Sequence, residues 1–364
     1  MKIQEIISAL EIMAHSSLQE HYDNVGLLTG SASWNCTGII CTLDVTEDVV
    51  KEAEEKKCNL IVAHHPIIFG GLRKLNGKNY AERTVIAAIK NDIAIYATHT
   101  NLDNVLSGVN GRIASVLGLK NVKILAEKEN TLKKLYTFVP SGKAEDVRAA
   151  IFEAGAGQIG NYSECSFNSD GMGTFKASEN SNPFVGNKEE RHTEAETRIE
   201  VIFPAHLQSK VVAAMKVAHP YEEVAYDVVA LANNHPATGS GVVGELETPF
   251  TENEFLTLLK QRFKVPVVRH SALLNRQIRK VAVCGGAGSF LIFKSLATGV
   301  DAFVTADMKY HEFFDANSSL LIADIGHYES EQFTIDLLQE VLAQKFPTFA
   351  VLKTGVNTNP VHYF

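Results

Sequence analysis

Residues 59–66 read NLIVAHHP, an apolar run that ends in two adjacent histidines and a proline. The run 59–63 predicts a buried strand of a parallel sheet, because such strands are continuously apolar and β-branched and are bounded by chain breakers. Pro66 cannot continue a central strand, so His64 and His65 fall at the carboxyl end, where open α/β sheets bind ligands. Both histidines can serve one centre only if the chain turns there, since neighbouring strand residues point to opposite faces. Otherwise one histidine belongs to the core and the other to the surface.

Strands and helices alternate on both sides of this run. In the first part of the chain we predict helices at 3–13, from 44–47 to about 57 and at 79–91, and strands at 37–43 and 93–97. Near the end we predict helices at 251–263, from 290 and from 327 to about 342, and strands at 280–284, 302–305, 320–324 and 349–354. This alternation is typical of an α/β fold with parallel sheets and helical crossovers.

The middle of the chain has a different character. We predict strands at 133–139, 198–203 and 225–230, helices at 144–154 and 206–218, and an irregular Gly/Ser/Asn-rich stretch at 155–186. This order indicates a ferredoxin-like α+β insert with the split βαβ pattern. The Gly-, Asn- and Ser-rich residues 233–244 predict its exit linker. We therefore expect residues 1–124 and 243–364 to be two α/β halves of one domain, which the insert 125–242 interrupts.

Composition excludes several classes of protein. The chain has 364 residues, of which 45% are hydrophobic and 21% charged, which is ordinary for a soluble protein of two or three domains. The net charge of −8 and the scattered basic residues argue against a nucleic-acid surface. Five cysteines without a CxxC motif indicate reduced thiols and a cytoplasmic protein. We see no signal peptide and no apolar run of about 18 residues, so we expect no membrane partner.

Potential metal ligands follow three of the predicted strands, namely His64, His65, His99, Asp103, His327 and Glu331. Taken alone, Asp103 could cap a helix, and His327 with Glu331, four residues apart on one helical face, could be a solvated surface. Together, His64, His65, Asp103, His327 and Glu331 supply three imidazoles and two carboxylates without a thiolate. Such donors favour Zn, Mn, Fe, Co, Ni or Mg. Five ligands exceed one tetrahedral site, so we expect two divalent ions with a bridging carboxylate, roughly 3.5 Å apart.

Three further motifs have both functional and structural interpretations. Asp307 and His311 lie four apart beyond a strand and could orient ligands or handle substrate, although a capping Asp and an exposed His explain them equally well. The glycine-rich residues 285–289 could surround a phosphate with N–H groups, or form a tight turn without a ligand. The motif at 219–223, HPYEE, is expected to be structural.

Four segments together resemble the Nif-three-like family, whose members are also called GTP cyclohydrolase 1 type 2 homologs. They are YDNVGL (22–27), AHHP (63–66), ATHTNLD (97–103) and GHYESE (326–331). In the insert, GNYSECSF (160–167), GMGTF (171–175) and HPYEEVAYD (219–227) resemble the PII-like insert of the longer bacterial members. The resemblance implies a dinuclear metal site at His64, His65, Asp103, His327 and Glu331. It also implies a toroidal homohexamer with metal centres that face an internal cavity.

Two functions are consistent with these residues and with the resemblance. The first is a metal-dependent hydrolase, in which an activated water attacks a phosphoryl group or a purine carbon, Glu331 bridges the metals, and His99 or Asp307 transfers the proton. Its substrate would be a nucleotide, as the family name implies for GTP, or a phosphoester. The second is a non-catalytic metal-binding assembly that stores, delivers or senses metal or a small effector.

Overall fold

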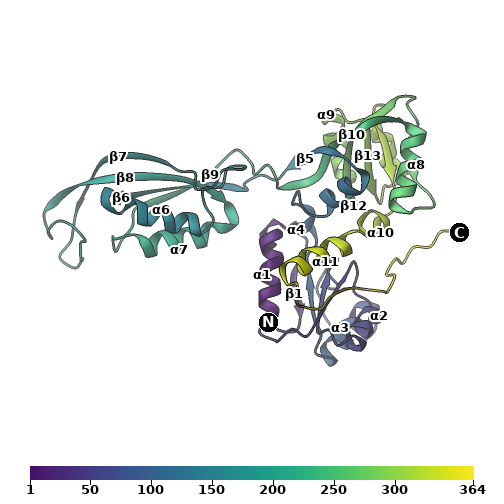
Figure 1. Ribbon diagram of the computed structural model, residues 1–364, viewed down its shortest axis with the longest axis horizontal. Helices are drawn as coiled ribbons and strands as arrows, with labels where there is room; N and C mark the ends of the chain where they lie inside the picture. Colours follow the sequence, from purple (N-terminus) through teal and green to yellow (C-terminus); the bar gives the residue numbers. More distant parts are fainter. The chain divides into compact units, whose positions relative to one another are not determined.

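The computed structural model describes residues 1–364, which form two compact units (Figure 1). The first unit comprises residues 1–127 and 236–364, and the second comprises residues 128–235. The second unit is smaller than the expected insert. Residues before 128 form β5 (Lys120–Glu127) and residues after 238 form β10 (Gly239–Thr251), and these two strands pair with each other in the first unit.

A five-stranded sheet organises one half of the first unit. Its order is β1-β4-β3-β2-β15. The strands are β1 (Gly26–Thr29), β2 (Ile39–Thr42), β3 (Leu60–Ala63), β4 (Ala94–Ala97) and β15 (Val351–Lys353). β1 runs antiparallel to β4, and the other pairs are parallel. The end of the chain therefore returns to the sheet that its beginning builds.

Helices cover both faces of this sheet, because its strand residues alternate between two cores. Ile61 and Ile95 pack with α2 (Glu47–Glu55) and α3 (Tyr80–Lys90), while Leu60 and Val62 face α1 (Ile3–Met13) and α11 (Thr334–Lys345). The Thr46 side chain caps α2 by accepting a hydrogen bond from the Val49 N–H group. Asp44 and Thr46 were the two candidates for this cap. Because Thr46 forms it, the Asp44 carboxylate does not cap α2.

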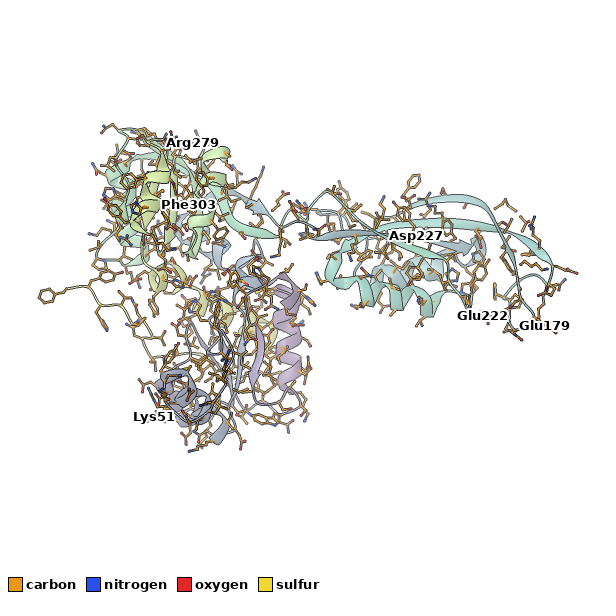
Figure 2. The ribbon with its side chains drawn as sticks, turned by 180° about the vertical axis from the view of Figure 1, so that it is seen from behind. Lys51, Glu179, Glu222, Asp227, Arg279 and Phe303 are labelled. Atoms are coloured by element: carbon orange, nitrogen blue, oxygen red, sulfur yellow. The ribbon has the colours of Figure 1, made fainter.

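A six-stranded sheet organises the other half of the first unit, in the order β11-β14-β13-β12-β10-β5. Its further strands are β11 (Arg269–His270), β12 (Gln277–Ala287), β13 (Ala302–Ala306) and β14 (Leu321–Asp324). β12, β13 and β14 are parallel, and the other pairs are antiparallel. One face shares its core with the first sheet through α5 (Val109–Leu117) and α8 (Glu252–Phe263). The other face, with Phe303, packs on η4 (Ser289–Leu291), α9 (Ile292–Thr298) and η5 (Tyr310–Ala316), and Figure 2 labels Phe303 inside this half.

One prediction for this region was confirmed only in part, and another was wrong. Residues 233–244 were expected to be the exit linker, and the boundary between the two units falls there, after His235, but β10 begins inside them. Its glycines serve close packing, since a Cβ at Gly239 would lie 2.1 Å from the Ala126 carbonyl oxygen of β5. The helix expected from 327 to about 342 is two helices, α10 (His327–Glu331) and α11. The remaining short elements are α4 (Thr100–Asp103) and η1 (Ser16–Leu18).

The second unit is a four-stranded antiparallel sheet in the order β7-β8-β6-β9, with two helices on one face (Figure 1). Along the chain it contains β6 (Leu132–Pro140), η2 (Ser141–Lys143), α6 (Ala144–Glu153), β7 (Phe167–Lys176), β8 (Arg191–Pro204), η3 (Ala205–Leu207), α7 (Gln208–Ala218) and β9 (Tyr226–Ala230). Leu135 and Val201 of the sheet pack on Ile151 and Met215 of the helices.

β7 was not predicted, because its residues fall inside the stretch 155–186 that was expected to be irregular. Most of its residues are exposed, and several are polar or glycine, so the strand has no alternating apolar pattern. Continuous pairing with β8, from Phe167 opposite Glu200 to Lys176 opposite Arg191, is what makes it a strand.

None of the helices combines the length and the apolar character that crossing a bilayer requires. All five cysteines are free thiols.

Candidate metal centre

The two sheets of the first unit place the ends of several strands beside one another. His64 and His65 follow β3, while α4 follows β4 and α10 follows β14. Figure 1 shows α4 and α10 where the two halves of the unit meet. Three overlapping groups of side chains could hold a metal there, with ligand atoms within 4.8 Å of one another in each group. They are His64/His65/His99, His65/His327/Glu331 and His64/Asp103/Glu331.

The Glu331 carboxylate lies at the centre of this cluster. Its Oε2 atom is 3.0 Å from His65 Nε2, 3.2 Å from His327 Nε2 and 3.9 Å from His64 Nε2. The side chain is almost completely buried, with 4% of it exposed. A buried carboxylate among three imidazoles is a strong anchor for a cation, because burial makes each electrostatic interaction larger than in water.

Two buried polar atoms in the cluster have no hydrogen-bond partner, namely His64 Nε2 and Asp103 Oδ1. They lie 3.7 Å apart, which is too long for a hydrogen bond. Leaving such atoms unpaired costs about 1–3 kcal/mol each. A divalent cation with nitrogen and oxygen ligands would satisfy both atoms at once. The donor set therefore fits a metal.

The chain turns after β3 so that both histidines face the cluster. The His64 and His65 N–H groups donate to the Thr42 and Leu43 carbonyl oxygens at 3.2 and 2.9 Å. In a regular parallel strand successive N–H groups point to opposite neighbours, so two successive bonds to one neighbour mark the end of the ladder. As a result the two imidazole rings lie 4.8 Å apart. The turn that the sequence required is present.

Three imidazoles are oriented by carboxylates behind them. Nδ1–H groups donate from His65 to Asp44 Oδ1 at 2.8 Å, from His327 to Asp307 Oδ2 at 2.7 Å and from His99 to Asp23 Oδ1 at 2.8 Å. A carboxylate behind an imidazole fixes the tautomer and makes the other nitrogen a better metal ligand. His64 is held instead by the Thr98 carbonyl oxygen, which accepts from Nδ1 at 2.9 Å.

Asp23 and Asp44 were not predicted from the sequence as residues of the site. Asp44 was considered only as a helix cap, although it follows β2, the neighbour of β3. Asp23 precedes β1, and because β1 is antiparallel to β4, residues before β1 lie beside those that follow β4. Both residues could have been found by looking for polar residues where the neighbouring strands β2 and β1 reach the edge of the sheet that holds His64, His65 and His99.

Burial and neighbouring charges shift the pKa values of the histidines and carboxylates in this cluster. Burial lowers the pKa of His65, but hydrogen bonds with Asp44 and Glu331 outweigh it and raise this pKa to about 9. Burial and the nearby Glu331 charge raise the pKa of Asp103 to about 7. Burial also opposes ionisation of Glu331, but the imidazoles of His327, His64 and His65 hold its pKa well below the usual value. A metal ion would take the place of the protons that now balance these carboxylates.

The other candidates from the sequence have different surroundings. Asp307 contacts His327 from a left-handed backbone conformation with φ of 55°. His311 is exposed and contacts the rings of Tyr310 and Phe314 instead of the cluster. The glycine-rich turn packs against the metal ligands, since a Cβ at Gly286 would lie 2.5 Å from Glu331 Oε1. Its Gly286 N–H group donates to Ser330 Oγ at 3.0 Å, and this packing explains the glycines without a phosphate.

The end of the chain also supports the cluster. After β15, Thr358 Oγ1 donates to Asp44 Oδ2 at 2.8 Å, and Asn359 Nδ2 donates to Glu329 Oε1 at 3.0 Å. Asp44 holds His65, and Glu329 belongs to α10, the helix that carries His327 and Glu331. Thr358 and Asn359 are therefore positioning residues.

Comparison with known proteins gives consistent matches along the whole chain. A model of the Duf34/NIF3 (NGG1p interacting factor 3) family matches residues 1–360. A GTP cyclohydrolase 1 type 2 homolog of Halalkalibacterium halodurans is 41% identical over 362 residues, which cover 98% of this chain and 97% of that protein. The crystal structure of a Bacillus cereus protein related to NIF3 has 40% sequence identity and a TM-score of 0.88, covering 100% of this chain and 99% of that one. A Staphylococcus aureus crystal structure has 30% identity and a TM-score of 0.80, with 100% and 99% covered.

Proposed function

The chain belongs to the Duf34/NIF3 family, and from this premise we propose that it binds two divalent metal ions and hydrolyses a nucleotide or a phosphoester. The ligands would be His64, His65, Asp103, His327 and Glu331. The observation that carries the proposal is the position of Glu331 Oε2, which lies near His64, His65 and His327 and so belongs to two of the ligand groups. His65 and His327 complete one group, and His64 and Asp103 complete the other. A shared carboxylate is the usual bridge between two metals.

Divalent ions in this cluster would polarise a phosphoryl or carbonyl oxygen and make a water molecule acidic near neutral pH. The chain's own residues would supply orientation and proton transfer. Asp44 and Asp307 hold the imidazoles of His65 and His327 in place. His99 is held by Asp23 beside the His64 and His65 rings, 5.3 and 5.4 Å from them between ring centroids, where it would accept and release a proton.

The relatives' names and the ligand set support the proposed substrate class. The relatives' name, GTP cyclohydrolase 1 type 2 homolog, favours GTP. Phosphoester hydrolysis suits the same ligands, because three imidazoles and two carboxylates with two metals are suited to an in-line displacement at phosphorus.

A second candidate function is a non-catalytic, effector-sensing metal protein. One observation favours it, namely a cavity of about 740 Å³ in the second unit, which contains none of the proposed ligands. We propose that this unit is the ferredoxin-like, PII-like insert, since its order is β-α-β-β-α-β. It would then report an effector to the metal-binding domain that the two α/β halves form.

We also propose that the protein is a cytoplasmic homohexamer. The support for the hexamer is a group of exposed aromatic side chains on η4, α9 and η5, with exposed fractions of 65% for Phe290, 68% for Phe293, 73% for Tyr310 and 69% for Phe314. α9 packs against η5, so these side chains lie in one region of the first unit. Exposed apolar groups of this size mark interaction sites. The five free thiols support a reducing compartment.

The test is a turnover assay with metal analysis on the same preparation. Metal-free protein is loaded with Mn²⁺, Zn²⁺ or Fe²⁺, its ions per chain are counted by mass spectrometry, and hydrolysis of GTP and of bis(p-nitrophenyl) phosphate is measured. We expect two ions per chain and turnover that the Glu331→Gln change abolishes. Two ions without turnover of either substrate class would favour the sensing function. One ion per chain would contradict the dinuclear centre.

A further inference from the structure

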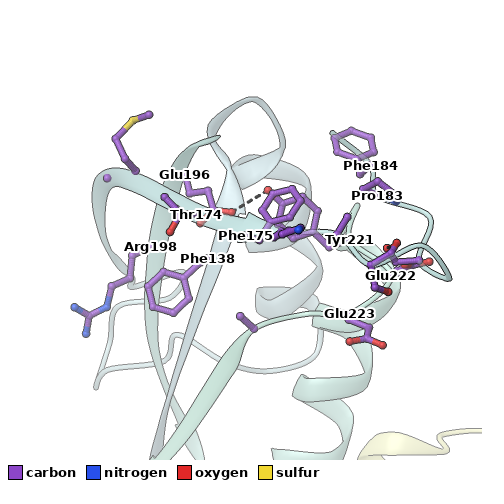
Figure 3. Close-up of a pocket in the computed structure, with 18 of the residues that line it drawn as sticks. Phe138, Thr174, Phe175, Pro183, Phe184, Glu196, Arg198, Tyr221, Glu222 and Glu223 are labelled. Carbon is purple, nitrogen blue, oxygen red and sulfur yellow. Dashed lines mark hydrogen bonds between the residues drawn. The ribbon is translucent and has the colours of Figure 1, made fainter. Parts of the chain in front are cut away.

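The second unit contains a cavity of about 740 Å³ that is separate from the metal-binding cluster. It lies at one end of this unit, between the β7–β8 hairpin, the loop 177–184 and the turn that joins α7 to β9 (Figure 3). Figure 2 places Glu179 and Glu222 at this same end. A volume of several hundred Å³ is that of a small-molecule site.

Aromatic side chains form much of the cavity wall. Phe138, Phe175, Phe184 and Tyr221 line it. The Tyr221 ring is 6.1 Å from Phe175 and 6.4 Å from Phe184, measured between ring centroids. Figure 3 shows Phe175 beside the hydrogen bond between the Tyr221 hydroxyl and Glu196, with Phe138 and Phe184 on either side of it. Such walls attract apolar bodies and, through the negative faces of the rings, cations.

The carboxylates of the cavity have no cationic side chain paired with them. Asp170, Glu196, Glu222 and Glu223 line it. Asp170 Oδ1 accepts a hydrogen bond from the neutral Thr197 hydroxyl at 2.7 Å. Glu196 Oε1 accepts a hydrogen bond from the Tyr221 hydroxyl at 2.8 Å, and Glu222 Oε1 accepts one from the Asn182 N–H group at 2.7 Å. Both donors are neutral. The negative charge of these groups is therefore available to a ligand.

The two cations that line the cavity are paired outside it. Lys176 Nζ lies 3.2 Å from Glu189, and Arg198 Nη2 lies 3.1 Å from Glu200. The Arg198 guanidinium also lies over the Tyr136 ring, 4.7 Å from its centroid. In Figure 3 the Arg198 side chain extends away from the aromatic group and lies far from Glu222 and Glu223. An anionic ligand would therefore have to compete with Glu189 or Glu200 for the cations among the lining residues.

Glu196 is held in place for contact with a ligand. Its carboxylate lies over Gly173 of β7, where a Cβ would be 2.0 Å from Glu196 Oε2, so a larger residue at position 173 would displace the carboxylate. On its other side, Tyr221 is fixed through its N–H group, which donates to His219 Nδ1 at 3.1 Å. His219 Nε2–H in turn donates to the Phe138 carbonyl oxygen at 3.0 Å. The HPYEE motif thus builds one side of the cavity, a role beyond the structural one expected from the sequence.

We propose that this cavity binds a small organic cation, an ammonium or quaternary ammonium group attached to an apolar body. The apolar body packs on Phe138, Phe175 and Phe184, and the positive charge lies against Glu196 and the Tyr221 ring. The proposal does not depend on the metal centre or on its activity, because every residue it uses belongs to the second unit.

The test is isothermal titration calorimetry of the full chain with three probes that share a phenyl ring and differ in charge. They are benzyltrimethylammonium, the neutral benzyl alcohol and the anion phenylacetate. We expect the ammonium probe to bind at least about tenfold more tightly than benzyl alcohol, and phenylacetate not to bind. Equal affinity for the charged and neutral probes, or tighter binding of phenylacetate, would overturn the proposal.

Two variants locate the site. Glu196→Gln keeps an acceptor for the Tyr221 hydroxyl but removes the charge, so it should weaken binding of the ammonium probe by about tenfold or more. Glu153→Gln makes the same charge change at an exposed position of α6 outside the cavity and should leave binding unchanged. Thermal melting of both variants establishes that they are folded. If Glu196→Gln is folded and binds the probe as wild type does, the proposal is wrong.

Discussion

The Glu331 carboxylate lies 3.0 Å from the His65 imidazole, although 266 positions separate the two residues in the sequence. This contact joins the carboxyl end of β3 in the first sheet to the helix that follows β14 in the second. The metal-binding cluster therefore exists only when the two halves of the first unit are packed together. Ligand binding to it should stabilise the whole unit and not one half.

Replacing Glu331 by Gln should remove most of the metal affinity. The change preserves shape but takes away the charge on which both ligand groups depend, so we expect the dissociation constant for Mn²⁺ or Zn²⁺ to rise by more than about 100-fold. Competition with a fluorescent chelator measures it. Glu340→Gln on α11, an exposed position outside the cluster, is the matched control. Retention of two tightly bound ions by Glu331→Gln would show that Glu331 is not a ligand.

Asp44→Asn should weaken metal binding without touching a ligand. Asp44 accepts from His65 Nδ1, and an asparagine there would orient the imidazole less firmly and make it less basic. A loss of about 10- to 100-fold in metal affinity is expected from such outer groups. Asp48→Asn, an exposed position in the first turn of α2, should have no effect on affinity. Equal affinities for the two variants would mean that Asp44 is only structural.

Thr358→Val should produce a smaller loss of the same kind. Its hydroxyl donates to the second oxygen of Asp44, so removing it loosens the carboxylate that holds His65. We expect metal affinity to fall by less than about tenfold. Combined with Asp44→Asn, the change should add nothing further, since both act through the same imidazole. Additive losses in this double-mutant cycle would show that Thr358 acts on the centre by another route.

The sequence predicted the elements whose residues face a core and the order of the candidate ligands that follow them. β2, β3, β4, β13 and β14 are short and fully buried, so each reads as a mainly apolar run. Because parallel strands end at one edge, His64, His65 and Asp103 could be assigned to a common edge from the order of elements alone. The packing of His327 and Glu331 against them depends on contacts between two sheets, which no local pattern encodes.

What the sequence could not predict has a common physical cause, namely that long-range pairing stabilises segments of weak local preference. β7 is exposed and rich in glycine, and it is a strand only because β8 lies beside it. β10 contains glycines because β5 approaches closely, whereas in the sequence they resemble a linker. Asp23 contacts His99 because β1 runs antiparallel to β4. A strand of four residues carries no sequence signal for its direction.

Acidification should destabilise the second unit through His219. Burial lowers the pKa of His219 and outweighs the Phe138 carbonyl and the Glu196 charge, which act in the opposite direction. In the unfolded chain His219 therefore binds a proton near the ordinary pKa of about 6.5, whereas in the folded chain it stays neutral at that pH. The contribution of His219 to the free energy of unfolding should be constant above that pH, and it should be lost as the pH drops through the lowered pKa of the folded state.

Urea unfolding of the full chain between pH 8 and pH 4.5, followed by circular dichroism and by hydrogen exchange of residues 128–235, measures this effect. In His219→Gln that part of the acid sensitivity should disappear, whereas His311→Gln, at an exposed histidine of the first unit, should keep it. Protection in the second unit that is the same at pH 8 and pH 4.5 would contradict this role of His219.

The exposed aromatic side chains of η4, α9 and η5 should be required for assembly. Phe293 is 68% exposed, and a glutamate there would place a charge in any interface that these rings form. We expect light scattering to give the mass of six chains for wild type and a smaller assembly for Phe293→Glu. Val217→Glu, at an even more exposed apolar position of α7 in the second unit, should remain hexameric. A wild-type mass of one chain would refute the hexamer, and a hexameric Phe293→Glu would exclude this surface from its interface.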